Sequence, residues 1–249
     1  NAQWAFKDFA TPLRPENPIP YMNQKGLVDR AGRPKEAYWV FKSRWTTDPI
    51  FCHLFGQGWT HRNGEKAERH QVRAYCNSEA AELVVNGEKQ GIKHRKHSEF
   101  PASGLYWGIS LREGVNELEV TGLVDGNAMA SDRLEINYST KKFGKLADIR
   151  LEQAPQEDGA IRITALAVDR GGRLVQDSSE RVYFSHVNPG SGGRLQTALG
   201  TPDGSAEIEM AKGKAEIVFE PAGKGQGTAV IEVRSQNHKG SYITIAGAK

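Results

Sequence analysis

From about Ile50 onwards, apolar and polar residues alternate with a period of two, in short runs separated by turns. Such alternation predicts strands that bury one face. Asn86-Gly87 is a strong hairpin signal between two apolar runs, and Arg112–Gly114 marks another turn. Short strands broken by frequent turns predict a β-sandwich of immunoglobulin-like type over residues 49–142. Its predicted strands are Ile50–Leu54, Gln71–Cys76, Ala81–Val85, Leu105–Leu111, Val115–Leu123 and Arg133–Tyr138.

A second set of alternating runs follows the polar stretch Ser139–Lys145. It predicts another immunoglobulin-like sandwich over residues 143–249. Two Gly-rich loops, Pro189–Gly193 and Gly223–Gly227, join strands and do not lead into a helix, so they do not indicate a phosphate site. The predicted strands are Ala147–Glu152, Ala160–Val168, Val182–Ser185, Ala206–Glu209, Lys214–Phe219, Thr228–Gln236 and Ser241–Ala246.

Residues 1–48 follow a different pattern. Gln3–Phe9 alternates and is rich in aromatic residues, which predicts a strand with Asp8 at its C-terminal end. Four prolines among residues 11–20 then predict a stiff, extended loop. Pro34 suits the first position of a helix over Lys35–Trp45, whose amphipathic spacing places Ala37, Val40 and Phe41 on one face. One strand–helix unit cannot fold alone, so we expect the end of a larger α/β domain, cut from a longer precursor.

Composition and charge exclude several classes of protein. The chain is 38% hydrophobic and 25% charged with a net charge of +3, which suits a soluble domain and gives no sign of a nucleic-acid partner. No apolar run approaches the roughly 18 residues that a membrane helix needs. The basic cluster Lys93–His97 favours a solvated hairpin over an anionic-ligand patch. Cys52 and Cys76 lack metal-ligand spacing and favour buried free thiols, although their pairing is left open.

The opening residues resemble the last βα unit of the (β/α)8 catalytic barrel of glycoside hydrolase family 2, which contains β-galactosidases, β-glucuronidases and β-mannosidases. The two sandwiches are similar to accessory domains that follow this barrel. The stretches that carry the resemblance are Trp4–Phe9, Pro18–Arg30, Arg33–Tyr38 and Trp45, with Val72–Asn77 and Glu82–Gly87 in the first sandwich. Active sites of such barrels lie at the C-terminal ends of the strands, where Asp8 and the Pro-rich loop fall.

The resemblance assigns roles to five residues. Trp4 matches an aromatic position that packs against the sugar, and Asn23-Gln-Lys25 matches an Asn-x-Lys pattern that contacts the C6 carboxylate in β-glucuronidases. Asp8 is a candidate for orienting loop residues, and Tyr21 is a candidate for lining the pocket. Alternatives stay open: Trp4 as a residue of the barrel core, and Lys25 as a surface cation.

The family uses two glutamates in a retaining mechanism, and both lie on earlier barrel strands. Neither Glu16 nor Glu36 matches them, so we expect no catalytic residue, metal or cofactor in this chain and no activity from it alone. The implied substrate is a terminal β-linked sugar, with Asn23-x-Lys25 favouring a uronide, and the implied partner is the rest of the barrel.

Two other functions remain open. One is a β-galactosidase for neutral sugars, and the other is a non-catalytic carbohydrate-binding or adhesive pair of sandwiches. The resemblance also implies a periplasmic or secreted protein and leaves a homo-oligomer open.

Overall fold

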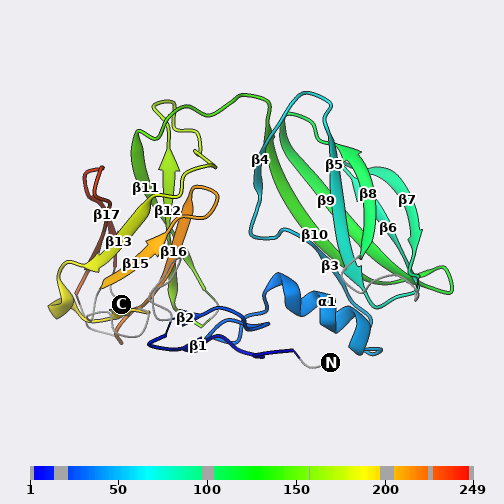
Figure 1. The fold of residues 1–249 in the computed structure, drawn as a ribbon, viewed down its shortest axis with the longest axis horizontal. Helices are drawn as coiled ribbons and strands as arrows, with labels where there is room; N and C mark the ends of the chain where they lie inside the picture. The colour runs from blue at the N-terminus through cyan, green and yellow to red at the C-terminus, as the bar shows by residue number, and fades with distance from the viewer. Residues whose placement is uncertain are drawn as a thin grey trace. The chain divides into compact units, whose positions relative to one another are not determined.

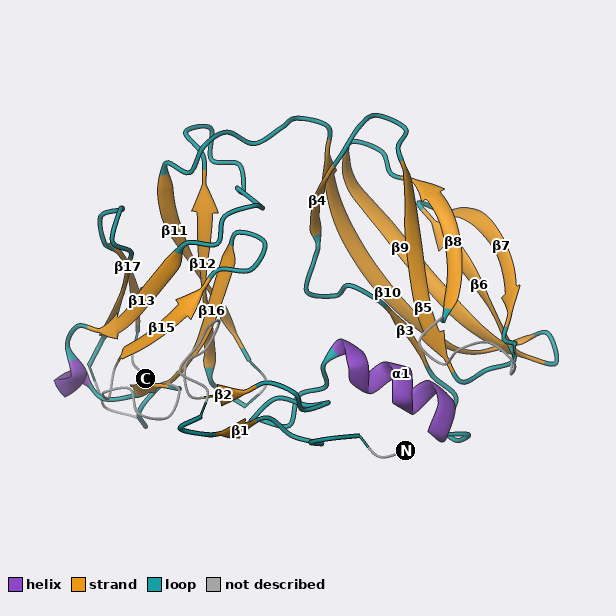
Figure 2. Ribbon diagram, viewed as in Figure 1, coloured by secondary structure: helices purple, strands orange, loops and turns teal. Residues whose placement is uncertain are grey.

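A computed structural model describes residues 3–13, 22–96, 104–156, 158–196, 205–223 and 227–246. The chain divides into two compact units, residues 1–8 with 25–142, and residues 9–24 with 143–249. Strands are the main regular structure of both units, as the orange ribbons of Figure 2 show. The boundaries predicted after residues 48 and 142 remain predictions.

The first unit contains a β-sandwich of two sheets (Figure 1). The larger sheet has the order β4-β10-β9-β6-β7 and the smaller one the order β3-β5-β8. The strands are β3 (Cys52–Leu54), β4 (His61–Asn63), β5 (Arg69–Cys76), β6 (Ala80–Val85), β7 (Glu88–His94), β8 (Leu105–Ser110), β9 (Gly114–Val124) and β10 (Asn127–Ser139).

Alternate side chains of these strands form one apolar core. On β8, for example, Leu105, Trp107 and Ile109 are buried while their neighbours are more exposed, as the period of two predicts. The predicted hairpin at Asn86-Gly87 is confirmed between β6 and β7. Both turn residues have positive φ angles, 52° and 83°, which is the conformation that Asn-Gly favours.

Two strands of the first sandwich escaped prediction because their sequences carry no apolar alternation. The three-residue strand β4 is entirely polar and pairs in parallel with the end of β10. The edge strand β7 is largely exposed, and it ends in Lys93 and His94 of the predicted basic hairpin. Edge strands of this kind are recognised by their pairing with a neighbour, which the local sequence does not reveal.

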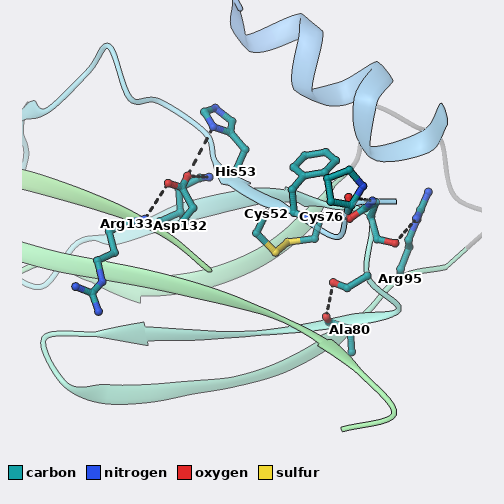
Figure 3. The surroundings of a disulfide bond; sticks show 12 residues. Cys52, His53, Cys76, Ala80, Arg95, Asp132 and Arg133 are labelled. Carbon is teal, nitrogen blue, oxygen red and sulfur yellow. Dashed lines mark hydrogen bonds and ion pairs between the residues drawn. A yellow bond between two sulfur atoms is a disulfide. The ribbon is translucent and has the colours of Figure 1, made fainter. Parts of the chain in front are cut away.

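The expectation of free thiols is wrong, because Cys52 and Cys76 form a disulfide. The two residues lie directly opposite each other on the antiparallel strands β3 and β5, which brings their Cα atoms to 4.1 Å (Figure 3). The pairing depends on β3 being the neighbour of β5 in the folded sheet. The distance between the two cysteines along the sequence does not reveal that these strands are neighbours.

The predicted helix is confirmed as α1 (Glu36–Trp45), and of its predicted apolar face Val40 and Phe41 are half-buried. Ala37 is exposed, whereas Ser43 is buried and Trp39 stacks on His53 of β3 with ring centroids 4.4 Å apart. The helix therefore docks through a flat aromatic contact and polar groups.

The second unit contains a sandwich of two four-stranded sheets, β11-β12-β16-β14 and β15-β13-β17-β18. Ile163, Phe184, Phe219 and Ile231 are at most 1% exposed in its core. The strands are β11 (Asp148–Pro155), β12 (Ile161–Val168), β13 (Arg181–His186), β14 (Arg194–Leu195), β15 (Ser205–Glu209), β16 (Lys214–Glu220), β17 (Ala229–Arg234) and β18 (Ser241–Ile245). A short 3-10 helix, η2 (Pro189–Ser191), lies in one predicted Gly-rich loop.

The strand predicted at Gln3–Phe9 is not continuous. Ala5 has a φ angle of 65°, which interrupts the extended backbone, and Lys7 makes only an isolated parallel bridge with Val28. The strand β1 begins later, at Phe9–Ala10, and pairs with β2 (Met22–Asn23). The predicted fold class, mostly β with two immunoglobulin-like sandwiches after a short α-containing segment, is confirmed.

Candidate functional site

Asp8 is the anchor of the opening segment. Its side chain is only 8% exposed, and its Oδ1 accepts hydrogen bonds from the backbone N–H of Gly26 and from Lys35 Nζ, both at 2.8 Å. The backbone N–H of Asp8 also donates to the carbonyl of Val28 at 3.0 Å. Asp8 therefore ties the first residues of the chain to the segment that follows Lys25 and to the residue before α1.

Gly26 permits this close approach because it has no side chain. A Cβ atom at this position would lie 2.3 Å from the backbone nitrogen of Asp8, well inside van der Waals contact. Leu27 and Val28, which follow, are both buried. The backbone immediately after Lys25 is thus fixed by packing and by a buried carboxylate.

Gln3 links the two residues that the sequence singled out most strongly. Its side-chain amide donates to the carbonyl of Trp4 at 3.1 Å and to the carbonyl of Lys25 at 3.4 Å. The backbone at Trp4 therefore lies next to the backbone at Lys25. Gln3 was predicted only as the start of a strand, and the bridging role of an amide at this position has no local sequence signal.

The predicted site residues differ in their surroundings. Trp4 is 73% exposed and Lys25 is exposed, so neither side chain is part of a core in this chain. Asn23 lies in β2, opposite Phe9, and is half-buried. Tyr21 lies outside the described residues, as does Glu16. Among the predicted residues that the structure describes, Asp8 alone is buried, which suits a positioning role better than contact with a ligand.

Glu36, His53 and Asp132 form a second cluster of titratable groups. His53 Nε2 lies 3.1 Å from Glu36 Oε2, and its Nδ1 lies 3.6 Å from Asp132 Oδ2, as Figure 3 shows for the latter pair. Burial raises the pKa of Glu36, but hydrogen bonds from His53 and the Gly56 N–H outweigh it and hold that pKa below its usual value. Because Trp39 stacks on the imidazole, this cluster fastens α1 to β3 and leaves His53 little access to a substrate.

The remaining polar candidates do not assemble into a catalytic group. His61, His70 and His94 lie on separate strands. Arg95, next to the basic strand end, donates to the carbonyl of Asn77 at 3.1 Å. Across the described ranges, no three His, Cys, Asp or Glu side chains are arranged to hold a metal ion. Nor does any helix there have the length and apolarity to cross a membrane.

Comparisons with known proteins agree on one class. A family model described as a domain of unknown function (DUF4982) matches residues 67–130, within the first sandwich. A Formosa agariphila protein named "Putative beta-glucuronidase" is 46% identical over 98% of the chain. The apo structure of Bacteroides uniformis beta-glucuronidase 3 is 36% identical over 98% of the chain, with a TM-score of 0.84. The Bacteroides ovatus beta-galactosidase BoGH2A is 26% identical over 89% of it.

These similarities place the chain with the glycosidases. More specifically, the predicted resemblance to glycoside hydrolase family 2 is confirmed, and it extends over nearly the whole chain. The chain spans only 29% of the length of the Formosa protein, 30% of the B. uniformis structure and 25% of the B. ovatus protein. It therefore corresponds to a part of such a protein.

Proposed function

We propose that this chain is the C-terminal part of a retaining exo-β-glycosidase that removes terminal β-linked uronic acids from oligo- or polysaccharides. The observation that carries the proposal is the 46% identity to a protein named as a β-glucuronidase, together with the Asn23-x-Lys25 pattern. The B. uniformis β-glucuronidase, with its TM-score of 0.84, supports the same class.

Lys25 supplies the reason to favour a uronide. Its ammonium is a compact positive charge that suits the C6 carboxylate, and an amide such as that of Asn23 adds a hydrogen-bond donor. If the sugar were neutral, Lys25 would face a hydroxymethyl group. Such a group compensates poorly for the hydration that the ammonium loses on binding. The side chain of Lys25 is exposed in this chain.

Trp4 and Asp8 take complementary roles in this proposal. The exposed ring of Trp4 serves as a platform for the apolar C–H face of the sugar. Asp8 positions the Lys25 segment through the Gly26 N–H, and does so before a ligand arrives. Groups held in place beforehand lose little ordering entropy on binding. Gln3 holds the Trp4 and Lys25 backbones together.

The cleavage chemistry belongs to the rest of the complete enzyme. A retaining mechanism needs two carboxyl groups about 5–5.5 Å apart across the scissile bond. Glu36 is engaged by His53 and the Gly56 N–H, and we do not assign it a catalytic role. This chain alone is expected to bind its sugar weakly and to cleave nothing.

The test is Lys25→Ala in the complete enzyme, assayed with a chromogenic β-glucuronide and β-galactoside. Loss of one charge-assisted contact, worth about 1.5–3 kcal/mol, should lower kcat/KM for the glucuronide roughly ten- to hundredfold. The galactoside rate should change little. Lys66→Ala, which removes an exposed lysine from a turn of the first sandwich, is the matched control.

Two results would redirect the proposal. A small effect on the glucuronide, with galactoside cleaved faster, would favour a β-galactosidase, an alternative that the B. ovatus relative supports. Absence of hydrolysis of both substrates by the complete protein would favour the non-catalytic carbohydrate-binding or adhesive pair of sandwiches.

The proposal includes a periplasmic or secreted location. The disulfide between Cys52 and Cys76 supports it, because such bonds persist in oxidising compartments and are rare in the cytosol. Quantifying free thiols in protein isolated under acid quench tests this point. Two free thiols per chain in the native protein would contradict it.

A further inference from the structure

A groove with a volume of about 870 Å³ lies in the second sandwich, away from the candidate sugar site in sequence. Its lining comes from three segments of the chain: residues 143–146 before β11, the loop that leads into β13 together with the start of that strand, and Gln236–Asn237 after β17. This volume falls within the range of pockets that hold small organic ligands.

The lining combines the groups that recognise sugars. Phe143 and Tyr183 supply aromatic surface, Asp177 supplies a carboxylate, and Gln236 and Asn237 supply amides. A sugar hydroxyl can donate to a carboxylate and accept from an amide, while the C–H face of the ring packs on an aromatic side chain. Phe143 is also packed against the apolar core, which fixes its position.

Hydrogen bonds hold the groove in shape before any ligand binds. Glu180, whose side chain is 19% exposed, accepts from Asn237 Nδ2 at 3.3 Å, and its backbone carbonyl accepts from the Met210 N–H at 2.9 Å. The Glu180 N–H donates to Ser178 Oγ at 3.4 Å. The loop before β13 is thereby connected to the segment after β17. Such preorganisation reduces the entropic cost of binding.

The charges of the groove favour a neutral ligand. Asp177 and Glu180 face the groove together with Lys145 and Arg181, so carboxylates and cations are balanced. The charge of Arg181 is compensated by Glu207, whose Oε1 lies 3.0 Å from Arg181 Nη1. A polyanion would meet two carboxylates without a dominant positive charge to offset them. A hydroxyl-rich neutral chain meets no such penalty.

We infer that this groove binds a neutral, hydroxyl-rich glycan, such as a stretch of uncharged polysaccharide. The groove would hold a chain segment that is distinct from the terminal sugar, and the inference does not depend on whether that sugar is a uronide. Asp177 and Gln236 contact ligand hydroxyls, and an aromatic ring of the groove, Tyr183 or Phe143, contacts a sugar face.

Affinity electrophoresis of the full chain tests this inference. Gels would contain a soluble β-glucan, a galactan, a xylan or, for comparison, the anionic polygalacturonate. We expect at least one neutral polysaccharide to retard the chain. The double variant Asp177→Ala/Gln236→Ala, which changes two exposed side chains, should weaken that retardation about ten- to thirtyfold. Glu88→Ala/Gln90→Ala on β7 removes the same two types of group and is the matched control.

Each result of the electrophoresis either supports the proposed glycan site or contradicts it. Retardation that the groove variant loses and the control keeps would establish the site. No retardation by any neutral polysaccharide, retardation by polygalacturonate alone, or equal retardation of both variants would each overturn it. Thermal unfolding of the variants verifies that each remains folded. Because hydrolysis is not measured, failure here leaves the proposed glycosidase function untouched.

Discussion

The two sandwiches differ in how their first strands are held in place. The chain enters the first sandwich through α1 and β3, and it enters the second through residues 143–147 and β11. At the first entrance the chain is held by a covalent bond and an imidazole between two carboxylates. At the second it is held by one carboxylate that accepts backbone N–H groups. The two sandwiches have similar folds, but chemically different interactions stabilise the segment through which the chain enters each of them.

A side-chain amide, that of Asn77, also stabilises the segment that enters the first sandwich. Asn77 Oδ1 accepts from the Phe51 N–H at 2.7 Å, and its Nδ2 donates to the carbonyls of Thr46 and Pro49 at 3.2 and 3.0 Å. Asn77 directly follows Cys76, so the disulfide and this amide act at the same place. Together they fix the segment that connects α1 with β3.

In the second sandwich, the entering segment is held by Asp169, which is only 4% exposed. Its carboxylate accepts from the N–H groups of Gly144, Gly171 and Arg173 at 2.7–3.0 Å, and from Arg173 Nε at 2.9 Å. These bonds, foremost those from Gly144 and the Arg173 backbone, lower the pKa of Asp169 to about 2. The first sandwich should thus respond to reductant, and the second to acid.

Breaking the disulfide should have the largest effect. The bond closes a loop with a sequence separation of 24, so its removal should cost ~3 kcal/mol through the entropy of the unfolded chain. In Cys52→Ser/Cys76→Ser, hydrogen exchange measured by mass spectrometry should accelerate throughout β3–β10. Exchange in β11–β18 should not change.

Reductant provides the control for the disulfide. Treatment of the wild-type chain should reproduce the exchange pattern of the double variant, and treatment of the variant should add nothing. Faster exchange in both sandwiches would show that the two do not unfold independently. That result would contradict the prediction that the disulfide stabilises the first sandwich alone.

Asp169→Asn should have the next largest effect, and it should be confined to the second sandwich. A carboxylate with a lowered pKa stabilises the fold above its usual pKa of 3.8, and this contribution disappears as the pH falls towards about 2. The Tm of the variant should therefore be lower than that of the wild type near neutral pH. Calorimetry should show the two Tm values converging between about pH 4 and 2.

Two observations would contradict the role of Asp169. One is a difference in Tm that stays constant down to pH 2, and the other is faster hydrogen exchange in β3–β10. Asp158→Asn is a suitable control, since its carboxylate accepts only a local hydrogen bond from the Ala160 N–H two residues away.

Glu36→Gln should have the smallest effect, about 1 kcal/mol for a weakened hydrogen bond to His53. The pKa of Glu36 lies below its usual value of 4.5, so its contribution is present above that pH and is lost in acid. Exchange in α1 should accelerate near neutral pH, with little change in the core strands. An unchanged α1 would show that the stacking of Trp39 on His53 suffices to dock the helix.

Sequence periodicity predicted the sandwiches well because burial of one strand face is a local signal. β8 and β9 alternate clearly, and their predicted bounds lie within a residue of those observed. Asn86-Gly87 was equally predictable, since its positive φ angles are a property of those two residues. The polar strands β4 and β7 carry no such signal, because their hydrogen-bonding neighbours define them.

The candidate site was predicted in part. Resemblance singled out Trp4, Asn23, Lys25 and Asp8, and their roles stay predictions. The bond from Asp8 to the Gly26 N–H and the bridge by Gln3 join residues that lie 18 and 22 positions apart. Long-range contacts of this kind appear only after the backbone has folded. The same reason explains why the pairing of the cysteines was missed.

The close approach of Gly26 to Asp8 has a consequence for how this segment can evolve. Any side chain at position 26 would collide with the backbone of Asp8, so this position tolerates no substitution without a shift of the chain. Gln24 and Lys25, immediately before it, are exposed. In the role proposed for Lys25, a single mutation at residue 25 would change the charge offered to the sugar while the supporting backbone stays the same. Under that proposal, the preference for a sugar would change more easily in evolution than the fold.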